Sequence, residues 1–182
     1  MSDIAAELAK LQVLEGAEFV VQLKKIVACG EFHPYENGSR IFITGGEGKE
    51  DFVNLINAAQ KAIKRGYTVY VLPDPDVVRS ADFIFVRKGV YKLYDLKTIS
   101  GKSSAENRLI ESIGQTNRVL LNILADYNPG SLARSIKRYF ENNSSALEVL
   151  VFKGRKMVSV TRDLTLSSQY YQLFMKRYLK GK

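Results

Sequence analysis

The sequence has only one cysteine, Cys29, and only one histidine, His33, in 182 residues. These counts exclude an internal disulfide framework, a zinc site built from thiolates and a metal cluster built from histidines. No apolar run approaches the roughly 18 residues that a membrane-spanning helix needs. The first residues mix acidic and basic side chains in an amphipathic pattern, which is not that of a secretory signal peptide. Because a lone thiol fits a reducing compartment, we expect the protein to act in the cytoplasm.

Acidic residues are also in short supply. The chain has 19 Asp and Glu against 27 Lys and Arg, which gives a net charge of +8, and its hydrophobic share of 46% is that of a globular protein. A basic balance favours a polyanionic partner. We expect this partner to be nucleic acid rather than an anionic membrane surface, the alternative being a basic protein without such a partner.

Hydrophobic spacing and turn residues predict the order of the elements. Residues 1–47 are expected to form an N-terminal helical extension, with a helix over 3–28, packed on a core of residues 48–182. The expected elements that follow are a strand at 40–44, a helix at 50–65, a strand at 67–75, a strand pair within 80–98, helices at 103–127 and 132–142, strands at 146–154 and 156–161, and a helix at 167–182. This order predicts an α/β or α+β fold, in which helices flank a small mixed sheet.

The stretch "SADFIFVRKGVYKLYDLKT", residues 80–98, looks like a hairpin whose ends carry charges. A turn at 87–89 would place Asp82 opposite Asp95, and side-chain alternation puts Asp95 and Lys97 on the same face. Two opposed carboxylates repel each other, so they need a compensating partner. A bridging Mg²⁺ would supply it, because carboxylate oxygens are its preferred protein ligands. The alternative is a cluster of salt bridges on an edge strand.

Asp82, followed after twelve residues by Asp95-Leu96-Lys97, resembles the PD-(D/E)xK nuclease motif. The predicted order of elements is similar to the α-β-β-β-α-β core of that superfamily over residues 48–152. The resemblance implies that Asp82, Asp95 and the Leu96 carbonyl bind Mg²⁺ or Mn²⁺. It also implies that Lys97 positions or activates a water molecule and touches the scissile phosphate.

Many members of the superfamily add two further residues to this site. One is a Glu on the first core helix, for which Glu50 is the candidate here, although Glu47, Asp51 or Asn54 could serve instead. The other is a Gln on the helix after the motif, which implies that Gln115 lies on the predicted helix 103–127 and faces the site. The alternative for Gln115 is a solvated surface position.

The stretch "RLIESIGQTNRVLLNI", residues 108–123, extends the resemblance to the C-terminal tRNase domains of bacterial contact-dependent growth inhibition toxins. The implied substrate is RNA, with tRNA favoured, and the implied partner is an immunity protein. The domain would then be delivered as part of a larger secreted toxin. The alternatives are a DNA endonuclease of the same superfamily and a non-catalytic domain that binds nucleic acid or serves assembly.

Basic residues outside the motif are candidates for phosphate contacts. The predicted nucleic-acid-binding residues are Lys102, Arg118, Arg134, Lys137 and Arg138, with Lys153, Arg155 and Lys156 extending the same basic cluster. The aromatic residues of the tail, 170–182, are expected to pack in the core, the alternative being that they stack on bases.

Overall fold

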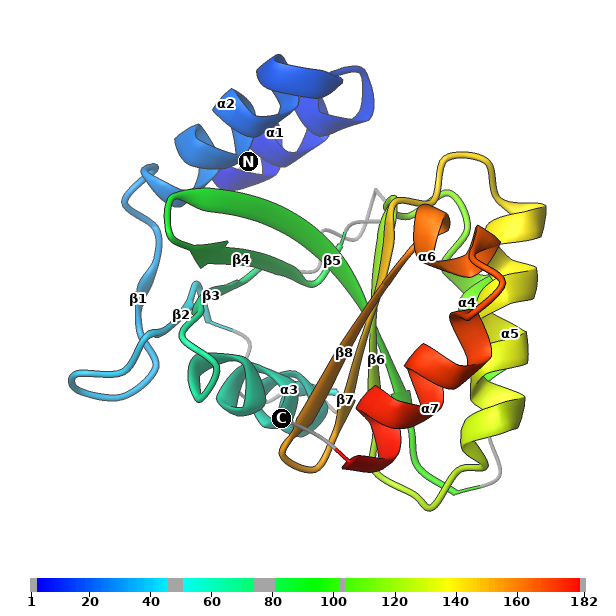
Figure 1. The fold of residues 1–182 in the computed structure, drawn as a ribbon. Helices are drawn as coiled ribbons and strands as arrows, with labels where there is room; N and C mark the ends of the chain where they lie inside the picture. Colours follow the sequence, from blue (N-terminus) through cyan, green and yellow to red (C-terminus); the bar gives the residue numbers. More distant parts are fainter. Residues whose placement is uncertain (1–2, 46–50, 74–80, 102–103, 181–182) are drawn as a thin grey trace. The chain divides into compact units, whose positions relative to one another are not determined.

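The computed structural model describes residues 3–45, 51–73, 81–101 and 104–180 (Figure 1). The chain divides into two compact units, Met1–Tyr94 and Asp95–Lys182. The sequence-based boundary between residues 47 and 48 stays a prediction.

In the first unit, two N-terminal helices pack on one face of a strand hairpin (Figure 1). They are α1 (Asp3–Ala9), which continues into a short 3-10 turn, η1 (Lys10–Gln12), and α2 (Gly16–Val27). Their buried apolar residues are Ile4, Leu8, Leu23 and Ile26, which cluster with Ile84 and Leu93 of the hairpin. The prediction of one helix over 3–28 is therefore wrong in one respect. The helix is interrupted before Gly16, which has a φ of 56°. The spacing of hydrophobic residues carries no signal for such an interruption.

The strands of the first unit alternate in direction except at one crossover. They are β1 (His33–Pro34), β2 (Ile41–Ile43), β3 (Thr68–Val71), β4 (Phe83–Arg87) and the first part of β5 (Val90–Ile99). Helix α3 (Phe52–Ile63) connects β2 to β3, which run parallel, whereas β3, β4 and β5 pair antiparallel. The predicted helix at 50–65 and the strands at 40–44 and 67–75 are confirmed, with shorter bounds.

The predicted hairpin is also confirmed. Lys88 and Gly89 form the turn with φ values of 49° and 75°, and two successive positive φ angles match the twist of a tight hairpin. The resulting register places Phe83 opposite Tyr94.

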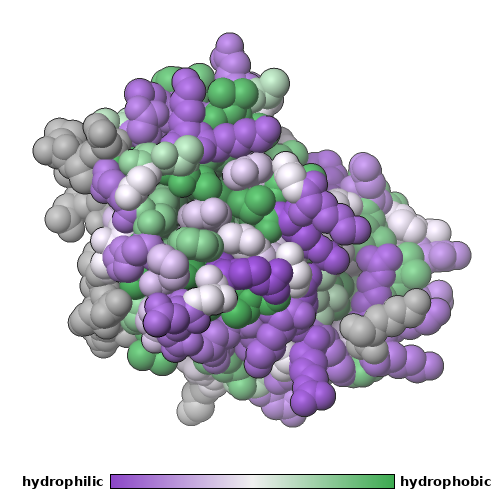
Figure 2. Space-filling model, turned by 90° about the vertical axis from the view of Figure 1, so that its left-hand side faces the viewer, coloured by the Kyte–Doolittle hydropathy of each residue, from purple (hydrophilic) through white to green (hydrophobic). Residues whose placement is uncertain are grey.

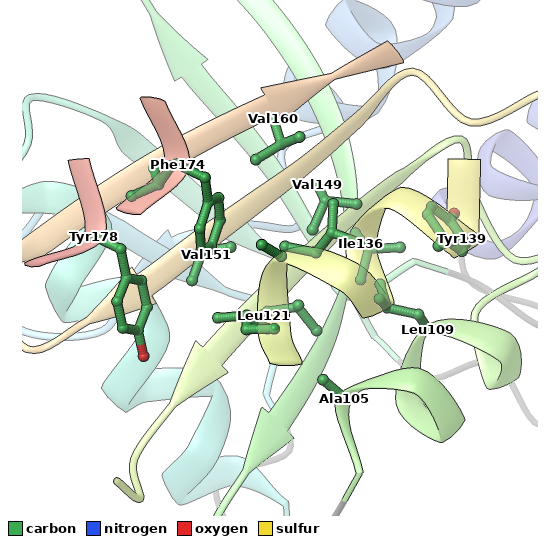
Figure 3. Packing of buried hydrophobic residues seen from close by; sticks show 14 of the residues in the cluster. Ala105, Leu109, Leu121, Ile136, Tyr139, Val149, Val151, Val160, Phe174 and Tyr178 are labelled. Carbon is green, nitrogen blue, oxygen red and sulfur yellow. The ribbon is translucent and has the colours of Figure 1, made fainter. Parts of the chain in front are cut away.

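The second unit is built from two successive strand–helix–strand crossovers and a final hairpin. From β5 the chain passes through α4 (Ala105–Glu111), β6 (Arg118–Ile123), α5 (Pro129–Asn142), β7 (Glu148–Lys153), β8 (Lys156–Thr161), α6 (Arg162–Leu166) and α7 (Tyr170–Lys180). Strands β5, β6 and β7 are parallel, and β8 returns antiparallel to β7. Side chains of α4, α5 and α7 pack with those of β6, β7 and β8 in one apolar core (Figure 3).

The prediction of a long helix over 103–127 is wrong. Helix α4 ends at Glu111, and Gly114, with a φ of 84°, turns the chain out of the helix. The following "RVLLNI" is β6, in which Val119 and the next four residues are all buried. A strand buried on both faces appears in the sequence as a continuous apolar run, which hydrophobic periodicity cannot distinguish from a buried helix. The remaining predicted elements, 132–142, 146–154, 156–161 and 167–182, correspond to α5, β7, β8 and α7.

Neighbouring strands pair in chain order from β1 to β8, and β5 belongs to both units because its first residues pair with β4 and its last with β6. The eight described strands form a mixed sheet, so the predicted mixed α/β class is confirmed, with a larger sheet than expected. On the face drawn in Figure 2, hydrophilic side chains surround small apolar areas. Among the described residues, no helix is both long and apolar enough to cross a bilayer.

Candidate functional site

The candidate site of the second unit lies on the part of β5 that belongs to this unit, Asp95–Ile99. Asp95 is in register with Val119 and Lys97 with Leu121, and paired residues of adjacent strands point to the same face of a sheet. Val119 and Leu121 belong to the apolar core under the helices. The Asp95 and Lys97 side chains therefore lie on the helix-covered face, where apolar residues are the rule.

Lys97 bridges two acceptors at this position. Its Nζ donates to Asp95 Oδ1 at 3.1 Å and lies 3.0 Å from Asp95 Oδ2. The same Nζ donates to Gln115 Oε1 at 3.2 Å. Asp95 is 2% exposed and the Lys97 side chain 14% exposed, so this is a largely buried ion pair with an amide attached to it.

Gln115 reaches Lys97 from a turn and not from a helix. The turn follows α4, and the Gln115 amide donates to the Ser112 carbonyl at 3.1 Å. Ser112 is fully buried, and its Oγ donates to the Leu109 carbonyl at 2.7 Å. The predicted proximity of Gln115 to the motif is thus present in the structure, but the predicted helix that was to carry Gln115 is not.

Two side chains without a predicted role border this cluster, Ser112 and Tyr139. Burial raises the pKa of Tyr139 on α5, the neighbouring Ser112 and Asn143 side chains lower it, and the negative charge of Asp95 raises it. Tyr139 is 3% exposed, and it packs in the core beside Leu109 (Figure 3). Its place on the apolar face of α5 is that of an ordinary core aromatic, so the sequence holds no signal for its proximity to Asp95.

Asp82 belongs to the first unit. Its amide donates to the carbonyl of Tyr94 at 2.9 Å, and its own carbonyl accepts from the Leu72 amide at 2.9 Å. The hairpin ladder therefore extends to Asp82, whose partner Tyr94 precedes Asp95 in the sequence, and the Asp82 side chain is half-buried. Asp82 and Asp95 lie in different units, and their joint metal site stays a prediction.

The predicted acidic residue of the first core helix has four candidates, two of which lie among the described residues. Glu50 and Glu47 lie outside the described residues, as does the predicted phosphate-binding residue Lys102. Asp51 is exposed at the N-cap of α3, and Asn54 is half-buried on that helix.

Within the described ranges, no group of three or more His, Cys, Asp and Glu side chains is arranged to hold a metal ion. The donor that the second unit offers is the Asp95 carboxylate. A single carboxylate fits Mg²⁺ when substrate phosphates, water or one more carboxylate complete the octahedron.

Several of the predicted phosphate-binding residues already have partners in the protein. Arg118 Nε lies 3.5 Å from the carboxylate of Glu148, which is buried and also accepts from Ser159 Oγ at 2.7 Å. On α5, Arg138 pairs with Glu106 at 3.3 Å.

Two further lysines donate to main-chain carbonyls, Lys153 to that of Ala125 and Lys156 to that of Leu179. Arg134 on α5 is exposed, and Lys137 lies on the same helix, half-buried. No carboxylate within the described part of the chain lies within ion-pair distance of Arg134 or Lys137.

Comparison with known proteins gives no match: no protein-family model, curated protein or solved structure is similar to this chain.

Proposed function

We propose that the chain is a metal-dependent nuclease that hydrolyses phosphodiester bonds of RNA, with tRNA as the favoured substrate. The observation that carries this proposal is the contact of Lys97 Nζ with both Asp95 and Gln115. The proposed context is a bacterial toxin whose nuclease domain is held inactive by an immunity protein.

The energetics of the Asp95–Lys97 pair favour a functional role. Removing two charges from water costs several kcal/mol per ion, and apolar residues of similar volume often stabilise a core as well or better. A nearly buried pair at the edge of an apolar face is therefore poorly explained by stability alone. Charged groups held in such surroundings are typical of catalytic sites.

The proposed metal, Mg²⁺ or Mn²⁺, would be held by Asp95 and the Leu96 carbonyl, with Asp82 and Glu50 as the further ligands that the motif implies. When bound, such a metal polarises a phosphate oxygen and lowers the pKa of a bound water. The ammonium of Lys97 carries three donors, and two acceptor groups hold it in place here. Exchange of one Asp95 oxygen for a phosphate oxygen would let Lys97 stabilise the charge that develops on the phosphate.

The charge distribution supports a polyanionic substrate for the second unit. Residues 95–182 contain 15 Lys and Arg against 7 Asp and Glu, a net charge of +8, whereas residues 1–94 contain 12 of each. The whole excess of positive charge therefore lies in the unit that holds Asp95, Lys97 and Gln115. Such a field attracts nucleic acid and raises the rate of encounter.

The order of elements gives further support. Along the chain, α3, β3, β4, β5, α4 and β6 follow each other, which is the α-β-β-β-α-β order that the resemblance implies. In this order Asp82 directly precedes β4, and Asp95 and Lys97 lie on β5.

The test is cleavage of three labelled substrates, tRNA, duplex DNA and single-stranded DNA, with Mg²⁺, with Mn²⁺ and with EDTA. We expect cleavage of tRNA that depends on the metal and is lost in Asp95→Asn and in Lys97→Met. Lys64→Met is the matched control, because Lys64 is an exposed lysine of the first unit. Cleavage of duplex DNA in place of tRNA would assign the DNA endonuclease alternative. Binding without any cleavage would assign the non-catalytic one.

A further inference from the structure

An exposed aromatic ring lies between α5 and α7 in the second unit. Tyr171 is 41% exposed, and Lys137 Nζ lies 5.7 Å from the centroid of its ring. The neighbouring Tyr170 is buried, donates its hydroxyl to the Ala133 carbonyl at 2.9 Å, and packs against Tyr171 with ring centroids 5.1 Å apart. Tyr171, on α7, is therefore held at a fixed place against α5, although part of its ring faces solvent.

Lys137, beside this ring, and Arg134 have no carboxylate within ion-pair distance in the described part of the chain. Arg134 lies one helical turn before Lys137, so the two share a face of α5. The Arg134 guanidinium contacts only a neutral hydroxyl, Ser131 Oγ at 3.1 Å, among the polar contacts described for it. The nearest acid on the same helix face is Glu141, one turn beyond Lys137 and exposed.

We propose that Arg134, Lys137 and Tyr171, the α5–α7 surface, bind an unpaired stretch of RNA. One base would stack on the exposed part of the Tyr171 ring, and the flanking phosphates would contact Arg134 and Lys137. This inference rests on the proposed function for its choice of RNA, and it adds that the recognised part of the substrate is single-stranded.

The combination of groups selects this ligand. Cations alone would serve any polyanion, but an aromatic ring contributes only where a base is free to leave its stack. In a duplex the base faces are covered, whereas loops and single strands of RNA expose them to aromatic side chains. An acidic protein segment would use the two cations and leave the ring without a partner.

The experiment measures binding in EDTA, so that it does not depend on cleavage. Fluorescence anisotropy with the full chain would compare a labelled 12-nucleotide single-stranded RNA with a blunt RNA duplex of the same sequence. Because one stacked base contributes roughly 1–3 kcal/mol, we expect Tyr171→Ala to weaken single-strand binding by about tenfold or more. We expect Tyr171→Phe, which keeps the ring, to stay within about twofold of the wild type.

Charge variants test the phosphate contacts. Arg134→Gln and Lys137→Gln should each weaken binding and reduce the salt dependence by about 0.7 in log–log slope, the value for one single-strand phosphate contact. Lys64→Gln is the matched control, because Lys64 is an exposed cation of the first unit that belongs to no predicted phosphate contact. A thermal unfolding curve for each variant shows whether the fold is intact.

The proposal is overturned if Tyr171→Ala binds single-stranded RNA as well as the wild type does. It is also overturned if the duplex binds as tightly and loses as much affinity in Tyr171→Ala, or if single-stranded DNA is preferred over RNA of the same sequence. These results leave the cleavage test unaffected, because loss of the Asp95–Lys97 site would abolish cleavage and leave binding in EDTA intact.

Discussion

Replacement of Lys97 by Met tests whether the buried ion pair exists as the structure has it. At the Nζ–Oδ2 distance of 3.0 Å and an effective dielectric constant of about 20, the attraction is about 5 kcal/mol before desolvation. Removing one partner of a fully buried pair costs about 3–5 kcal/mol. Because the Lys97 side chain is 14% exposed, we expect Lys97→Met to lower the free energy of unfolding by about 3 kcal/mol, at the lower end of that range.

The same geometry reverses an expectation drawn from the sequence. Repulsion between Asp82 and Asp95 predicts that loss of Asp95 leaves stability unchanged or raises it. The structure gives Asp95 a cationic partner, so Asp95→Asn should instead destabilise the protein, by about 1–2 kcal/mol, because the lysine stem can still direct its ammonium toward water. The double variant Asp95→Asn/Lys97→Met should lose less than the sum of the single variants, with a coupling of about 2 kcal/mol.

The assay is urea unfolding of the four proteins at pH 7 and at two salt concentrations, provided that each shows a single transition. The coupling should persist at 1 M NaCl, because salt screens buried pairs poorly. The control cycle uses Arg138 and Glu106, whose side chains are 61% and 41% exposed; its coupling should be below about 1 kcal/mol and should fall with salt. A coupling between Asp95 and Lys97 as small and as salt-sensitive as that of the control would refute the buried pair.

Variants at three further residues test other contacts. Gln115→Ala should lower the single-turnover cleavage rate by about tenfold, a scale typical of removing a side chain that orients a site residue, while leaving stability within about 0.5 kcal/mol. Burial raises the pKa of Tyr170, so its contribution to stability is present below the unfolded value of about 10 and is lost as pH rises through the folded value. In urea titrations between about pH 10 and 12, Tyr170→Phe should therefore lose stability less steeply than the wild type, by about 1.4 kcal/mol per pH unit. Arg162 donates to the carbonyls of Phe140 at 2.8 Å and Asn143 at 2.6 Å beside the end of α5, so thermal unfolding of Arg162→Met should show a loss of about 2 kcal/mol that Arg162→Lys does not restore, because a single ammonium cannot replace the planar fork.

The hairpin was predictable because its information is local. Alternating apolar residues and the Lys88-Gly89 turn determine the register, and the register determines where Asp82 falls relative to Tyr94. The shared face of Asp95 and Lys97 follows from strand geometry alone. No information from the rest of the chain was needed for either.

The partners of those residues were not predictable from local patterns. Apart from Arg118 and Asn122, β6 is apolar, and the choice between helix and strand there depends on its pairing with β5 and β7, which lie far from it in the sequence. Gln115 was therefore assigned to the wrong element. Its contact with Lys97 is nevertheless present, because the turn that follows α4 brings Gln115 beside β5.

The partners of the basic residues were likewise not predictable from the sequence. In the sequence, Arg118 and Arg138 look equivalent to Arg134 and Lys137, but the structure pairs the first two with carboxylates. The eight Lys and Arg residues that the sequence predicts as phosphate contacts therefore overstate how many cations are free to release counterions from a nucleic acid. If the α5–α7 surface supplies the main contacts, the logarithmic salt slope for single-stranded RNA should lie near the about 1.4 expected for two phosphates, and far below the about 5.6 that eight would give. A slope near the larger value would mean that nucleic acid displaces the internal carboxylate partners, and that the ion pairs of Arg118 and Arg138 open on binding.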